Sequence, residues 1–177
     1  MARALGVALA ALCGALLPAA GSGRAQTPRP PPSVAVLNLT FYGAHANSLE
    51  PGDSLLAERA TERLLATLRA SDRLSMLDSA RVTRAVTAAE ADGERCTVAC
   101  ARDVGRALGA RWVAKGQVNK TSNLIWVFTG QLIEVATGRV VLDDEYELKG
   151  QAATMVPAGA HVFAQRVERA VSQSLAE

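Results

Sequence analysis

The order in which strand-like and helix-like patterns follow one another constrains this fold more than any other feature. Residues 34–39 are almost continuously apolar, which is typical of a buried strand. A loop over 40–52 follows and ends at Asp53, a residue type that caps helices well. Beyond it, apolar residues recur at every fourth position, which predicts an amphipathic helix packed on a sheet. These residues are Leu56, Ala60, Leu64 and Leu68.

The next segment continues this alternation of strand and helix. Residues 74–77 predict a short strand. Asp78 or Ser79 then caps a second helix that runs to about residue 91. A third helix is expected over 97–108, because Gly109 follows it in the position where glycine commonly ends a helix.

The last part of the domain predicts a meander and a final helix. Three strand-like runs at 112–118, 124–135 and 140–148 are separated by short turns, as in antiparallel meanders. An apolar stripe at four-residue spacing predicts a helix over 160–176. The order βαβαα, meander, helix predicts an α+β fold, with a single mixed β-sheet of about five strands and helices packed on it.

Residues 1–25 have the pattern of a secretory signal peptide. Arg3 gives a positive start, residues 4–20 are small and apolar, and Gly23 and Ala25 offer small residues at the cleavage positions. Cleavage is therefore expected between Ala25 and Gln26. The alternatives are a membrane anchor and a lipoprotein. The apolar run is short and interrupted for an anchor, and Leu12 precedes Cys13 where a lipidated cysteine normally follows a small residue.

Removal of this segment leaves a tether and one domain. Residues 26–33 contain four prolines and predict an extended tether, and residues 34–177 form the single domain, without a second membrane-spanning segment. The alanine- and arginine-rich composition is typical of a bacterium with GC-rich DNA, so we expect a periplasmic or secreted protein. Nineteen Lys and Arg against seventeen Asp and Glu give +2, which argues against nucleic acid as a partner.

Four segments carry a resemblance to a known group of proteins. They are Val34-Ala35-Val36-Leu37, residues 73–78, the run from Cys100 to Gly116 and residues 132–138. In order and spacing they resemble the small secreted bacterial families of unknown function related to the TolB N-terminal domain and to the curli-secretion protein CsgG. The resemblance covers residues 34–148 and implies a TolB-like fold, a cell-envelope setting and binding to partner proteins.

The departures from this pattern limit what the resemblance implies. Arg111 and Glu134 stand where relatives usually carry aspartate. The chain also lacks the lipid signal and the amphipathic insertions with which CsgG builds a membrane barrel, so a pore function does not carry over. The resemblance transfers no catalytic residues.

Cys96 and Cys100 are the sharpest local signal. Once Cys13 is removed with the signal peptide, they form an even pair in an oxidising compartment. If Cys96 precedes the helix and Cys100 lies in its first turn, their Cα atoms come close enough for a disulfide. A redox-active dithiol and half of a metal site are the alternatives.

The other polar residues give weaker signals. His45 and His161 are the only histidines and have no acidic or nucleophilic motif beside them, so we interpret both as incidental. Asp143, Glu145 and Glu147 share one face of the last strand. Calcium binding or acid–base chemistry would use such a set, but a solvated strand face accounts for it better. Lys115, Gln117 and Asn119 are expected on the same kind of face.

Taken together, the residues indicate a non-enzymatic binding or adaptor domain that docks another cell-envelope protein. The loop over 40–52 and an exposed strand edge are the candidate contact regions. No catalytic constellation, cofactor or metal is expected, and the oligomeric state is left open. The alternatives are a thiol/disulfide redox factor that uses Cys96 and Cys100, and a carrier of a small ligand.

Overall fold

The structure is a computed structural model that describes residues 30–175 except residues 45, 47, 92 and 94. The predicted signal peptide, its cleavage site between Ala25 and Gln26, and His45 lie outside the described residues. The elements are β1 (Ser33–Val36), β2 (Thr40–Tyr42), α1 (Leu55–Arg69), β3 (Ser75–Met76), α2 (Ser79–Ala89), α3 (Val98–Leu108), β4 (Trp112–Lys120), β5 (Ile125–Glu134), β6 (Val140–Lys149) and α4 (Ala152–Gln173).

The predicted α+β fold with one mixed sheet is confirmed. The strand order is β3-β1-β4-β5-β6, and β2 also pairs with β4. Strand β1 is parallel to both β3 and β4, whereas β4, β5 and β6 form the predicted antiparallel meander. Because the early strands are joined through helices and the late ones through turns, the sheet is parallel on one side and antiparallel on the other.

The sheet has six strands rather than five, because the apolar run 34–39 does not stay in one strand. Val36 pairs with Ala114 and Thr40 pairs with Gln117. The chain advances four positions from Val36 to Thr40, whereas β4 advances only three positions from Ala114 to Gln117. The extra residue forms a bulge between β1 and β2. Residues 40–42, expected in a loop, therefore extend the same edge as β2.

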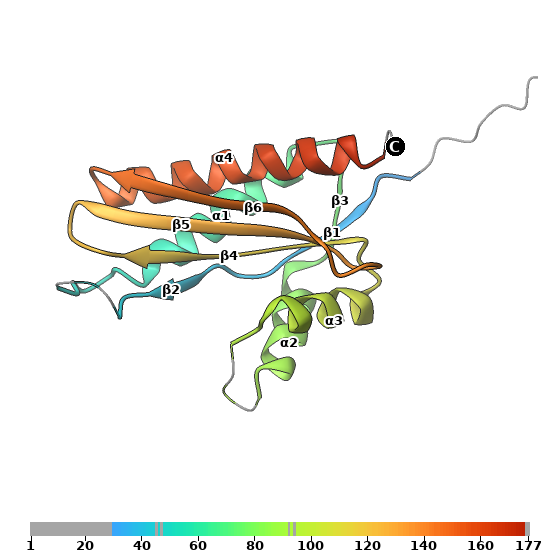
Figure 1. Ribbon diagram of the computed structural model, residues 1–177, viewed down its shortest axis with the longest axis horizontal. Coiled ribbons are helices and arrows are strands. Elements are labelled where there is room, and N and C mark those ends of the chain that lie inside the picture. Colours follow the sequence, from blue (N-terminus) through green and yellow to red (C-terminus); the bar gives the residue numbers. More distant parts are fainter. Residues whose placement is uncertain (1–29, 45, 47, 92, 94, 176–177) are drawn as a thin grey trace, which may run out of the picture.

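Helices α1 and α4 cover one face of the sheet. Figure 1 shows them running side by side along its length, with α4 in front of α1 in the upper layer. The main core lies between these helices and the sheet, and its largest fully buried side chains include Trp112, Trp126, Phe128, Phe163, Leu64 and Leu68. Burial of this apolar surface is the main stabilising contribution to the fold.

Helices α2 and α3 cover only part of the other face. They pack over the end of the sheet near β1, where Ala35, Leu37, Val113 and Ile133 form a smaller core with Val82. In Figure 1 these two helices lie below one end of the sheet, and the sheet continues well past them. The outer part of this face is thus left without a covering helix.

Two helix starts differ from the sequence prediction. Helix α4 begins at Ala152, eight residues earlier than expected, although Pro157 lies inside it. Pro157 lacks the N–H that would otherwise donate a hydrogen bond to the Ala153 carbonyl. Burial of Val156, Gly159 and Ala160 compensates for this loss and holds the early turns against the sheet. Helix α1 is preceded by Ser54, not capped by Asp53, whose carboxylate is used elsewhere.

Candidate binding face and pocket

Three rows of polar side chains cross the uncovered part of the sheet. The register aligns Lys115 with Gln131 and Asp143, then Gln117 with Thr129 and Glu145, then Asn119 with Val127 and Glu147. Side chains alternate between the faces of a strand, so all of these point away from α1 and α4. We call this surface the open face; it consists of Thr40, Lys115, Gln117, Asn119, Val127, Thr129, Gln131, Asp143, Glu145 and Glu147.

The three acids of the open face are exposed, as the solvated-face interpretation predicts, and the remaining residues on β4 and β5 are half-buried. Asp143 accepts a hydrogen bond from the Gln131 amide at 3.2 Å, and Glu147 pairs with Lys149 at 2.8 Å. Among the described residues, no group of three or more His, Cys, Asp or Glu side chains is arranged to hold a metal ion. The three acids lie along β6, at one border of the polar open face.

A pocket of about 460 Å³ lies where the open face meets α2. Its floor is formed by the sheet, and its walls by α2, the segment before α3 and the bulge between β1 and β2. The lining contains many hydroxyl and amide groups, together with four charged side chains. The polar lining residues are Asn38, Thr40, Thr83, Thr87, Glu90, Arg95, Lys115, Gln117, Thr129, Gln131 and Asp143.

Cys96 lines the pocket, and a disulfide connects it to Cys100. The Cα atoms of the two cysteines lie 5.1 Å apart. As the sequence geometry requires, Cys96 precedes α3 and Cys100 lies in its first turn, where Thr97 caps the helix by accepting a hydrogen bond from the Cys100 N–H. Cys96 is buried and Cys100 is half-buried.

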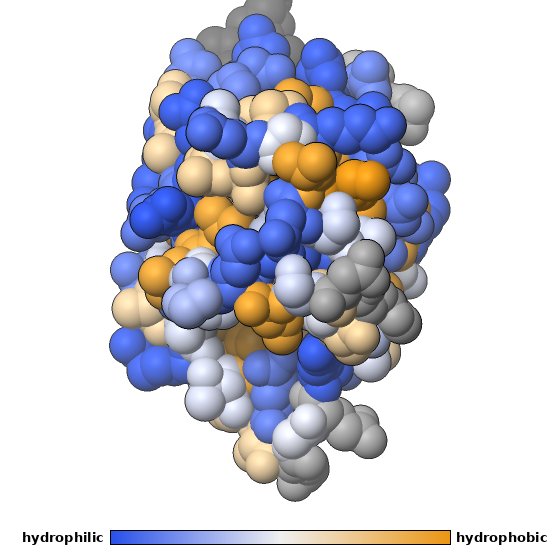
Figure 2. Space-filling view, turned by 90° about the vertical axis from the view of Figure 1, so that its left-hand side faces the viewer, coloured by the Kyte–Doolittle hydropathy of each residue, from blue (hydrophilic) through white to orange (hydrophobic). Residues whose placement is uncertain are grey.

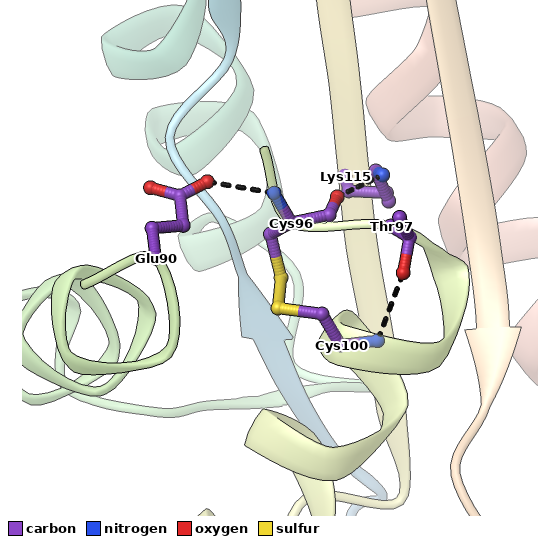
Figure 3. Close-up of a disulfide and its surroundings, with 5 residues drawn as sticks. All are labelled: Glu90, Cys96, Thr97, Cys100 and Lys115. Carbon is purple, nitrogen blue, oxygen red and sulfur yellow. Dashed lines mark hydrogen bonds between the residues drawn. A yellow bond between two sulfur atoms is a disulfide. The ribbon is translucent and has the colours of Figure 1, made fainter. Parts of the chain in front are cut away.

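Two charged side chains hold the backbone of Cys96 from opposite sides. The Glu90 carboxylate accepts a hydrogen bond from the Cys96 N–H at 2.8 Å, and the Lys115 ammonium donates one to the Cys96 carbonyl at 2.5 Å. Figure 3 shows Glu90 reaching Cys96 from one side and Lys115 from the other. The disulfide segment thereby links the end of α2 to strand β4.

Lys115 lies in a partly desolvated position. Burial lowers the pKa of its ammonium group from the usual lysine value, and the nearby Glu90 carboxylate partly opposes this shift. Within the described part of the chain, Lys115 forms no ion pair. Among the described residues, its ammonium group is therefore stabilised by the hydrogen bond to the Cys96 carbonyl and by the more distant Glu90 carboxylate.

Replacing both cysteines with serine is expected to lower the free energy of unfolding by about 2 kcal/mol, because the bond closes only a small loop. Urea unfolding of the oxidised proteins measures this difference. Reduction of the wild type should cause a similar loss and should leave the double variant unchanged. Equal stability of the double variant and the oxidised wild type would contradict this structural role.

On the opposite face, a buried ion pair escaped the sequence analysis. The Lys120 ammonium lies 2.7 Å from Oδ2 of Asp53, and the lysine side chain is 1% exposed. Asp53 also accepts a hydrogen bond from the Glu50 N–H, and Lys120 lies 5.5 Å from the ring centre of Trp126. The alternation of β4 could have predicted that Lys120 is buried, because Lys120 continues the series of core-facing positions 112, 114, 116 and 118.

The pKa of Asp53 gives this pair a defined pH dependence. Burial alone would raise the pKa, but the Glu50 N–H and the Lys120 ammonium outweigh it and hold the pKa below the usual aspartate value. A carboxyl with a lowered pKa in the folded state stabilises the fold above its unfolded pKa of about 3.9. That stabilisation is lost as the pH falls through the folded pKa.

We therefore expect the difference in unfolding free energy between wild type and Asp53→Asn to shrink as the pH falls from 6 to 3. Denaturant unfolding at several pH values measures it. A difference that stays constant over this range would show that the Asp53 carboxylate is not responsible.

Other polar residues join the helices to the sheet. Asp144, which is 5% exposed, pairs with Arg166 of α4 at 2.9 Å and accepts a hydrogen bond from the Tyr146 hydroxyl. Burial and the Asp144 carboxylate raise the pKa of Tyr146. His161 lies between α4 and α1, where Nδ1 is 3.0 Å from the Thr67 hydroxyl. These contacts join elements of the fold and take no part in the pocket lining.

The fold and the site define a small α+β domain with one helix-covered sheet face and one largely open, polar face. The chain belongs to the family described as "Protein of unknown function (DUF2380)", whose profile matches residues 32–166. No curated protein gives a significant match to the sequence.

Several solved structures are similar to this chain at low sequence identity. TolB from Acinetobacter baumannii is 15% identical with a TM-score of 0.52, and the match covers 84% of this chain but only 30% of TolB. The LpoB C-terminal domain from Salmonella enterica is 17% identical with a TM-score of 0.48, covering 67% of this chain and 83% of that one. A PelC dodecamer from Paraburkholderia phytofirmans is 18% identical with a TM-score of 0.46, covering 80% and 87%.

The comparison with TolB supports the TolB-like fold that the sequence resemblance predicted. The relation to CsgG stays a prediction. None of the helices within the described ranges is both long enough and apolar enough to cross a membrane.

Proposed function

We propose that this domain is a non-enzymatic binding module of the cell envelope that docks another envelope protein through its open face. The observation that carries the proposal is the unequal covering of the sheet. Two helices cover one face along its whole length, whereas α2 and α3 cover only one end of the other. Half-buried amide and hydroxyl groups are left pointing outward on the adjacent strands β4 and β5.

The chemistry of the open face suits a polar, reversible contact. Interfaces between proteins that associate and separate combine hydrogen-bonding groups with a charged rim. Here the amides and hydroxyls of β4 and β5 lie at the centre, and the acids of β6 form one border. A partner that docks here supplies basic groups opposite that border, because matching charges favour the encounter.

The loop over 40–52 and an exposed strand edge are the contact regions that the sequence indicates. Leu49 is exposed in this loop, Leu55 is exposed at the start of α1, and Leu124 is exposed in the turn between β4 and β5. Figure 2 views this end of the molecule, and the hydrophobic residues visible on it are interspersed with hydrophilic ones. A surface of this kind offers less continuous apolar contact than a docking site usually does, so we favour the open face.

The envelope setting and the absence of catalysis are parts of this proposal. The setting rests on the signal-peptide pattern of residues 1–25. The non-enzymatic role is supported by His161, the histidine within the described ranges, whose ring contacts Thr67 and Gln165 and does not line the pocket. General acid–base or nucleophilic chemistry would place such a group beside a reactive partner.

A charge-reversal experiment tests the docking face. Glu145→Arg changes an exposed residue of the open face, and Arg169→Glu changes an exposed residue of α4. After crosslinking in intact cells, we expect the first variant to retain less than about a tenth of the wild-type yield of the partner complex and the second to retain it fully. Equal yields from both variants would exclude the open face as the docking site.

The pocket favours a second candidate, a carrier of a small ligand. Its volume of about 460 Å³ lies within the range of small-molecule sites.

The redox alternative has weaker support, because Cys96 is buried, Cys100 is only partly exposed, and the disulfide is integrated into the start of α3. Thiol–disulfide exchange requires access to the attacked sulfur. An exchange assay with a small dithiol substrate, with the double serine variant as control, separates these alternatives.

A further inference from the structure

Two lysines of β4 are withdrawn from water to different degrees: Lys120 is buried and Lys115 is half-buried. Among the described residues, Lys120 forms an ion pair with a carboxylate and Lys115 does not. Lys120 faces the core and is paired with Asp53 at 2.7 Å. Lys115 faces the pocket, and its only hydrogen-bond acceptor among the described residues is the Cys96 carbonyl. An ammonium group withdrawn from water is normally compensated by an anion. The difference between these two lysines suggests that the counter-ion of Lys115 arrives with a ligand.

The other charged groups of the pocket leave this position open. The Glu90 carboxylate is engaged with the Cys96 N–H, and the Arg95 guanidinium lies 5.0 Å over the ring of Tyr42. Asp143 stands in the same row as Lys115 but two strands away, about 10 Å between Cα atoms at normal strand spacing. The cation and the acid thus mark opposite ends of the pocket floor.

The neutral lining indicates what surrounds the anion. Thr83 and Thr87 come from α2, and Gln117, Thr129 and Gln131 come from the sheet. Hydroxyl and amide side chains both donate and accept hydrogen bonds, so they suit a ligand with peptide-like or hydroxyl groups. An apolar ligand body would leave these groups without partners.

We propose that the pocket binds the carboxylate of a polar ligand, with the Lys115 ammonium as its ion partner and the Cys96 carbonyl as the group that fixes the lysine. The inference deepens the proposed function and rests on it. The carboxylate belongs to the docked partner, as a chain end or an acidic side chain, or to a free small molecule. The recognition chemistry is the same in both cases.

Three probes distinguish these sources. Acetyl-trialanine with a free carboxylate represents a peptide end, its C-terminal amide lacks the charge, and glutarate represents a small dicarboxylate. Each is titrated into the protein purified from cells expressing the full chain, and NMR shifts of the Gln117 and Gln131 side-chain amides report binding. We expect the acid peptide or glutarate to bind at least about tenfold more tightly than the peptide amide.

The carboxylate probe that binds more tightly identifies the source of the carboxylate: a peptide end of the partner or a free small molecule. Absence of binding by both probes to the wild type, or equal binding of the acid and amide peptides, would overturn the proposal.

Variants of the two lysines on this sheet face complete the test. Lys115→Met is expected to lower the affinity for the carboxylate probe at least about tenfold. Lys115→Arg is expected to retain most of the affinity, because the charge is kept. Lys149→Met removes an exposed lysine of β6 and serves as the control. Wild-type affinity in Lys115→Met would overturn the inference. The crosslinking experiment with Glu145→Arg does not depend on these probes. If the probes fail to bind, that experiment still tests the proposed docking function separately.

Discussion

Replacing Lys120 with methionine is expected to lower the free energy of unfolding by about 3–5 kcal/mol. The substitution leaves the Asp53 carboxylate buried without its counter-charge, and the residue is only 8% exposed. The hydrogen bond from the Glu50 N–H remains, but a single amide does not compensate for a lost ion pair at this depth. Urea unfolding followed by circular dichroism measures the change.

Two further variants identify the ion pair as the cause. Lys149→Met removes the lysine of an exposed pair and is expected to change the unfolding free energy by less than about 1 kcal/mol. The double variant Asp53→Asn, Lys120→Met should be more stable than Lys120→Met alone, because no unpaired charge remains. A Lys120→Met protein as stable as the Lys149→Met protein would contradict this interpretation.

Truncation of Phe163 is the second large effect. Phe163→Ala is expected to lower the free energy of unfolding by about 3–5 kcal/mol. The ring is fully buried, lies 5.6 Å from that of Phe128 between centroids, and covers Gly130 on β5. A Cβ atom placed at Gly130 would lie 2.7 Å from the ring. Because this glycine has no side chain that could fill the space, the cavity left by the truncation would persist.

The glycine provides an internal test of that explanation. Gly130→Ala alone should destabilise by about 1–3 kcal/mol through overpacking, but it should cost less, or even stabilise, when Phe163→Ala has removed the ring. Val162→Ala, at a residue that is 42% exposed on the same helix, is the control and should have little effect. Strictly additive costs of the Gly130 and Phe163 substitutions would show that the two residues do not share this space.

The meander was predictable because local signals suffice for it. Its strands alternate apolar and polar residues, and Gly138, with a φ of +77°, allows the tight turn before β6. The early βα alternation predicted the parallel side of the sheet for similar reasons. The start of α4 was not predictable, because Pro157 and the small residues around it show no apolar stripe, and only packing on the sheet holds those turns.

The site was predictable only in part. The sequence placed Lys115, Gln117 and Asn119 on a polar strand face, and strand periodicity alone accounts for that. The sequence did not predict the pocket, because the pocket depends on where α2 lies against the sheet. The Asp53–Lys120 pair joins residues 67 positions apart, and charged residues are normally assigned to the surface unless a partner is known.

Position-specific photo-crosslinking in living cells tests the central claim most directly. A photoreactive amino acid is introduced at Glu145 on the open face or, as the control, at Arg169 on the exposed side of α4. Our account predicts one dominant crosslinked protein from position 145 and none from position 169. A product formed only from position 169, or no product from position 145 while the protein is folded and abundant, would contradict docking through the open face.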